Sequence, residues 1–127
     1  MSGLTKASSL SETALLMQQT PKRLKRLVRE WAGVAHDREL SAALLELRGH
    51  FDRWHRAEIT AADLNEQIHK YHHGASREIW KHYATNHLEP AIGFAVATGI
   101  LRREELPSEL LEHVAGWIQF YAQQPAS

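Results

Sequence analysis

The chain has 127 residues, 43% of them hydrophobic and 24% charged, a balance typical of one globular domain rather than of a disordered segment. Fifteen basic and fifteen acidic residues cancel, which removes the global charge that draws small proteins to nucleic acid or to anionic membranes. The absence of cysteine excludes disulfides, thiolate nucleophiles and Cys-ligated zinc. We therefore predict a single domain over residues 1–127, with flexible tails at 1–8 and 124–127.

The sequence lacks both a membrane-spanning segment and a signal peptide, and this predicts the cellular compartment of the protein. No apolar run approaches the roughly 20 residues of a membrane span, and residues 1–19 lack a basic start followed by an apolar segment. We expect a cytoplasmic protein with no membrane partner. The nine histidines are the outlier in composition, and because histidine gains charge in mild acid, we expect partner choice to depend on pH.

The prolines stand where a helix starts or has already ended, and no alternating β-strand pattern of useful length occurs. We predict an all-α fold, a single compact bundle of about five to six helices. Ser9 and Glu12 have the capping-box spacing and predict a short first helix. Thr20 is expected to cap a second helix with Pro21 at its first position.

The outer face of this second helix is strongly basic, and its cations are Lys22, Arg23, Lys25, Arg26 and Arg29. Three uses are open: a solvated or salt-bridged face, a protein-binding face, and a phosphate-tracking face. Nucleic acid is the least favoured partner, because no aromatic, Asn or Gln side chain is interleaved to read bases.

Asp37 is expected to cap a third helix, whose apolar stripe is Leu40, Leu44, Leu47, Phe51 and Trp54. A short joint at residues 57–59 leads to Thr60, which repeats the capping-box spacing with Asp63. These two residues predict the start of a long fourth helix that ends near Tyr83.

The fourth helix combines a core stripe with a ridge of possible chemistry. At about 100° per residue the ridge contains Glu66, His69, His73 and Arg77, and Trp80 lies beside it as a second apolar direction. We interpret these five residues first as an interaction surface of a homodimer or of another protein complex. The spacing E-x-x-H-x-x-x-H also suits zinc or iron held by Glu66, His69 and His73, with acid-base catalysis as a third use.

Further residues of this helix carry weaker expectations. His72 and His82 lie toward the apolar stripe, where we expect buried, hydrogen-bonded histidines. Gly74 costs about 1 kcal/mol relative to alanine in a helix, and a close helix crossing is its expected reason.

The last third of the chain predicts two helices. Residues 90–101 contain no charge, so we expect a short central helix that ends at Gly99 in the left-handed conformation. After a charged turn at 102–105, Ser108 is expected to cap a last helix with an apolar side of Leu111, Val114, Ile118 and Tyr121.

The run from Ile68 to Lys81 reads IHKYHHGASREIWK. It resembles the signature Ile-His-x-Phe/Tyr-His-Asp-Gly-x-x-Arg-Glu-Leu-Trp-Lys of a family of small uncharacterised bacterial helical proteins. The resemblance extends over Ile59 to Leu106, and His73 stands where that signature has Asp. The resemblance implies no activity.

A second likeness is to the fluorescence recovery protein, a helical dimer that regulates a carotenoid photoprotein in cyanobacteria. The residues that carry it are Lys70, Tyr71, Phe94, Ala95, Gly99, Glu105 and Leu106. It implies a small helical regulator.

Two functions remain after the motifs are considered. The first is a non-enzymatic helical interaction or regulatory module, homodimeric and without a cofactor. The second is a metal-binding or metal-dependent bundle with zinc or iron at the Glu66, His69 and His73 ridge. Nucleophilic catalysis has no support, because the chain has no G-x-S-x-G turn, no cysteine and no glycine-rich phosphate loop.

Overall fold

The computed structural model describes residues 21–125, and within them it contains helices and turns but no strand. The helices are α2 (Lys22–His55), α3 (Ala61–Tyr71), α4 (Arg77–Tyr83), α5 (Glu89–Ala97) and α6 (Ser108–Ala122). A π-helical segment, His72–Ser76, joins α3 to α4, and a 3-10 turn, Arg103–Glu105, precedes α6. The all-α prediction is confirmed. The helix predicted at Ser9 and the Thr20 cap lie outside the described residues.

Helix α2 is a single element of 34 residues, so the prediction of a new helix at Asp37 is wrong. The Asp37 side chain is exposed, and no proline or left-handed residue interrupts the helix near it. An aspartate inside a helix costs less than about 1 kcal/mol. Ala32 and Ala35, just before it, are buried and carry the apolar period of α2 up to the expected break. Pro21 is the N-cap of this helix rather than its first residue.

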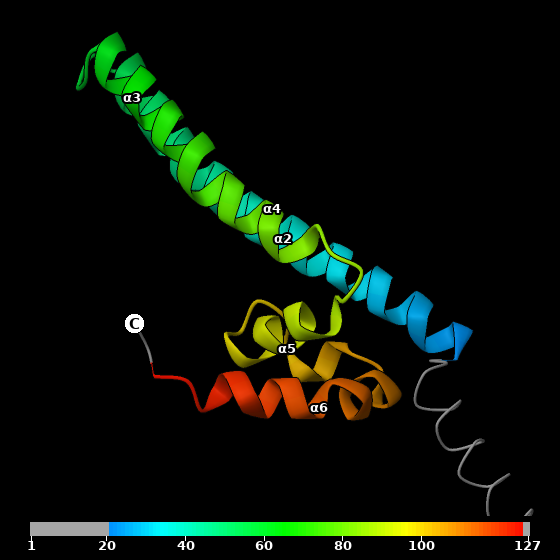
Figure 1. The fold of residues 1–127 in the computed structure, drawn as a ribbon. Helices are drawn as coiled ribbons and strands as arrows, with labels where there is room; N and C mark the ends of the chain where they lie inside the picture. The colour runs from blue at the N-terminus through cyan, green and yellow to red at the C-terminus, as the bar shows by residue number, and fades with distance from the viewer. Residues whose placement is uncertain (1–20, 126–127) are drawn as a thin grey trace, which may run out of the picture.

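The second half of α2 and the α3–α4 segment form a long hairpin, residues 36–83 (Figure 1). The turn between them is short, with Ala57 in the left-handed region at φ 62°. The Thr60 hydroxyl accepts a hydrogen bond from the Asp63 N–H at 3.1 Å, and the Asp63 carboxylate accepts one from the Thr60 N–H at 3.0 Å. The predicted capping box is confirmed, and the hairpin turns back at this point.

The hydrophobic core lies at one end of the molecule, in a part that we call the base: residues 22–35 of α2 together with residues 88–122. Helix α5 packs between α2 and α6 (Figure 1). Its uncharged sequence is buried as predicted, and the fully buried large side chains of the base are Ile92, Leu101, Leu110 and Val114. Gly99 has φ 84°, which confirms the left-handed stop of α5.

The start of α6 differs from the prediction. Ser108 is its first helical residue and makes no side-chain cap. The Pro107 carbonyl instead accepts hydrogen bonds from the N–H groups of Leu110 and Leu111, at 3.0 and 3.1 Å. A serine hydroxyl can cap only from the residue that precedes the first helical turn.

Two contacts beyond the apolar core fix the positions of the helices, one within the base and one from Arg38 on the adjoining part of α2. At Gly93 the backbones of α5 and α6 approach so closely that a Cβ atom would overlap the Trp117 Cβ and lie 2.8 Å from its carbonyl carbon. Arg38 donates hydrogen bonds to both Glu105 carboxylate oxygens, at 2.8 and 2.6 Å, and to the Ile100 carbonyl at 2.9 Å. The first contact fixes α5 on α6, and the second ties α2 to the turn before α6.

Among the helices of residues 21–125, none combines the length and the apolar character that crossing a membrane requires.

Candidate interaction surface

The ridge singled out in the sequence lies on the outside of the hairpin. Its five side chains are all exposed, and Trp80, at 64%, is the most exposed large hydrophobic side chain of residues 21–125. The rings of His69 and His73 lie parallel, with an interplanar angle of 6° and centroids 6.2 Å apart. The Glu66 carboxylate faces Lys70 at 3.7 Å. The ridge is therefore an open surface rather than a cleft.

The predicted metal site is not assembled within the part of the chain that the structure describes. Among residues 21–125, no three His, Asp or Glu side chains gather in a way that could hold a metal ion. The carboxylate of Glu66 pairs with a lysine instead of converging on the imidazoles of His69 and His73. Helical spacing aligns these residues on one face, but it does not make their ligand atoms meet.

The π-helical segment lies in the middle of the ridge, at His72–Ser76. Such segments are often found at functional sites. Gly74 lies inside it, and a Cβ atom built on Gly74 meets nothing within 4 Å. The close helix crossing expected at Gly74 is therefore wrong, and the crossing occurs at Gly93 instead.

We expect Gly74→Ala to stabilise the protein or leave its stability unchanged. Alanine is favoured over glycine in a helix by about 1 kcal/mol, and there is open space for the added methyl group. Urea unfolding followed by circular dichroism measures the change. Gly49→Ala is the matched control, because Gly49 also has open space and lies within regular α2. A loss of stability at Gly74 alone would show that the π-helical turn requires glycine.

Three large apolar side chains of the predicted stripe lie on one side of α2 and remain exposed: Leu44 at 48%, Phe51 at 42% and Trp54 at 44%. We call these residues the α2 patch. The predicted apolar stripe is present on α2, but its side chains do not belong to the core that residues 21–125 form. Leu40 and Leu47 of the same stripe are half-buried.

The hairpin has very little core of its own. Beyond Ala35, α2 has no buried residue, and α3, the π-helical segment and α4 together bury one side chain, Leu64. A helix of a globular protein gains most of its stability from packing an apolar face. The hairpin therefore presents more apolar surface than its two arms cover.

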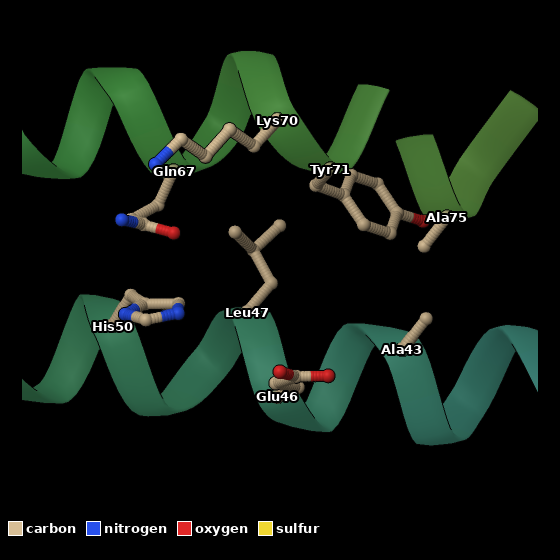
Figure 2. A pocket seen from close by; sticks show the side chains of 8 residues that line it. All are labelled: Ala43, Glu46, Leu47, His50, Gln67, Lys70, Tyr71 and Ala75. Atoms are coloured by element: carbon tan, nitrogen blue, oxygen red, sulfur yellow. The ribbon is translucent and has the colours of Figure 1, made fainter. Parts of the chain in front are cut away.

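A small hollow of about 170 Å³ opens between the two arms of the hairpin (Figure 2). Gln67 on α3 and His50 on α2 point toward one another across it, while Leu47 projects from α2 into the same space. The His50 Nδ1 atom is buried and has no hydrogen-bond partner within the described residues. Sequence reasoning missed His50 and Gln67. The available signal was their position at the polar edge of each apolar stripe.

A stacked pair of rings joins the two arms of the hairpin at the end next to the base. His36 on α2 and Tyr83 at the end of α4 have ring centroids 4.6 Å apart, with an interplanar angle of 15°. Burial, assisted by the neighbouring Glu39 carboxylate, raises the pKa of the Tyr83 hydroxyl well above its usual range. Tyr83 therefore stays protonated and serves as a packing residue.

The two histidines expected in the core are both exposed, so that expectation is wrong. His72 turns an edge toward His73, at a centroid distance of 5.2 Å. His82 packs edge-on against Phe94 of α5 at 5.4 Å. Both side chains stay exposed because a hairpin of two helices buries only a narrow stripe along each helix.

The chain has no match among protein-family models, curated proteins or solved structures. The two resemblances of sequence therefore remain predictions.

Proposed function

We propose that this protein is a non-enzymatic interaction module whose hairpin is completed by a second copy of the same chain. The observation that carries the proposal is the distribution of burial: the base has a core, whereas residues 36–83 bury one side chain and leave the α2 patch exposed. Patches of large apolar side chains on a soluble protein mark interaction sites.

The energetics favour a partner over exposure to water. Covering the remaining surface of the α2 patch contributes about 1 kcal/mol for each half-exposed side chain. A stable protein interface buries about 1,200–2,000 Å² in total, which requires a surface longer than one small patch. The length of the hairpin supplies such a surface, and Trp80 is a further exposed apolar side chain on α4.

A second copy is the proposed partner because the same patch then supplies both halves of the interface. Two-fold pairs are the commonest protein assemblies, and they bring a surface against itself. Apolar side chains suit this geometry, since they require no charge complementarity. The likeness to a helical dimeric regulator agrees with the same arrangement.

We expect the protein to be a dimer in light scattering at about 20 µM, which requires a dissociation constant below that concentration. Leu44→Glu combined with Phe51→Glu should convert it to a monomer with unchanged helix content in the base, because both side chains are already exposed in one chain. Phe120→Glu is the matched control, since Phe120 is 48% exposed but lies on α6. A wild-type monomer at this concentration would contradict the homodimer, as would equal dissociation by both changes.

A further inference from the structure

A second hollow, of about 410 Å³, lies on the base where the first turns of α2 face the connection between α4 and α5. Lys25, Val28 and Arg29 form one wall, and residues 85–89 form the other. It is more spacious than the hollow within the hairpin. Its volume lies in the range of small-molecule sites, which are about 300–1,000 Å³.

The α2 wall carries positive charge that the described residues do not neutralise. Lys25 and Arg29 are four residues apart, so they project from the same side of the helix. Neither forms an ion pair with another residue of 21–125, whereas their neighbour Arg23 pairs with Glu109. Both cations line the hollow, and neither has an ion-pair partner among the described residues.

The acid in the opposite wall is directed elsewhere. The Glu89 carboxylate lies 3.5 Å from the His113 Nε2 atom on α6. These two residues line a neighbouring hollow of about 210 Å³. Glu89 therefore lowers the positive potential of the larger hollow without pairing with either of its cations.

The rest of the lining suits an anion that has an apolar part. The Thr85 Oγ1 atom accepts a hydrogen bond from the His87 N–H at 3.2 Å, which leaves its hydroxyl hydrogen able to donate to a ligand. Asn86 adds an amide donor. Val28 is buried and Leu88 half-buried, so they form an apolar floor.

We propose that this hollow binds a small organic anion, with its phosphate or carboxylate group between Lys25 and Arg29 and its apolar part on Val28 and Leu88. Hydrogen bonds from charged donors to an oxyanion are the strong ones, and the arginine fork matches both groups. About 22 Å along α2 separates Arg29 from Leu44, so the site is distinct from the α2 patch and independent of the proposed homodimer.

The probe is phenyl phosphate, titrated into the full-length protein labelled with ¹⁵N. We expect saturable shifts of the backbone amides of residues 85–89, with a dissociation constant of about 1 mM or below. Lys25→Gln combined with Arg29→Gln should weaken binding by about tenfold, since both charged donors are lost. Lys22→Gln combined with Arg26→Gln is the matched control, because it removes the same charge from α2 at side chains that do not line the hollow.

Separate arms with inorganic phosphate and with benzoate identify the group that binds. Benzoate that binds as well as phenyl phosphate assigns the site to carboxylates too, and binding of phenyl phosphate alone assigns it to phosphates. Inorganic phosphate should bind more weakly than phenyl phosphate, and equal affinity would overturn the role of the apolar floor. The whole proposal is overturned if the 85–89 amides show no saturation by about 20 mM of either organic anion. It is equally overturned if both double variants weaken binding alike, because the effect would then be diffuse attraction to the basic helix.

Discussion

Gly93→Ala is expected to destabilise the protein by about 1–3 kcal/mol, the usual cost of forcing an extra carbon into a packed interior. The added Cβ would overlap the Trp117 Cβ and lie 3.0 Å from the Ile118 backbone nitrogen. These atoms belong to the α6 backbone or are fixed to it, so no side-chain rotation makes room. The two helices must separate, and the core around Ile92 loses its close packing. Urea unfolding monitored by circular dichroism measures the loss.

The matched control for this change is Gly116→Ala. Gly116 lies in α6, next to the crossing, but a Cβ on it meets nothing within 4 Å. Helix propensity favours alanine at both positions by about 1 kcal/mol. If the methyl group at residue 93 caused no clash between α5 and α6, both variants would therefore be more stable than the wild type. Stabilisation at Gly93 as well as at Gly116 would show that α5 and α6 lie farther apart than described here.

Arg38→Ala is expected to lower the melting temperature clearly more than Arg103→Ala, although both changes remove one exposed arginine. Arg38 joins three segments, since it binds the Glu105 carboxylate and the Ile100 carbonyl from its place on α2. Arg103 forms no ion pair or side-chain hydrogen bond within residues 21–125. Equal losses for both variants would mean that the ion pair is too solvated to matter, as is common at protein surfaces.

The same contact predicts a dependence on pH. The Arg38 guanidinium, followed by the Arg102 backbone N–H, lowers the pKa of the Glu105 carboxyl to about 2. Because the folded pKa lies below the unfolded one, this contribution to stability is complete above about pH 4.5 and is lost as the pH falls toward 2.

The difference in unfolding free energy between the wild type and Glu105→Gln should therefore be constant from neutral pH to about pH 5 and shrink below it. All other residues are the same in both proteins, so their contributions to the pH dependence cancel in the difference. Urea titrations of both proteins at a series of pH values test the prediction. A difference that stays constant down to pH 3 would contradict the assigned pKa of Glu105.

Stability is distributed unevenly along the molecule. Among residues 21–125, the base contains nearly all of the buried side chains, whereas the hairpin buries only Leu64. This division explains why the proposed interaction surface lies on the hairpin. An element that lacks a core within its own chain gains the most from a partner.

The sequence by itself determined the local elements. The Thr60 and Asp63 capping box, the left-handed stop at Gly99 and the buried α5 were all predictable. Each of these features depends on residues within one or two helical turns of one another. The types of those few residues are enough to predict the hydrogen bonds or the burial. The surface position of the basic side chains of α2 was predictable for the same reason.

Other outcomes depended on distances between helices, which no local pattern contains. Asp37 does not start a helix, because the buried alanines before it keep α2 continuous. Gly74 and Gly93 are both helical glycines, yet only Gly93 has a neighbouring backbone against it. Glu66, His69 and His73 share a face, but their ligand atoms do not converge on one point. Spacing along one helix determines the side from which each side chain projects, but not where its terminal atoms lie. The tertiary structure decided all three, because close approach, burial and convergence are properties of pairs of segments rather than of either segment alone.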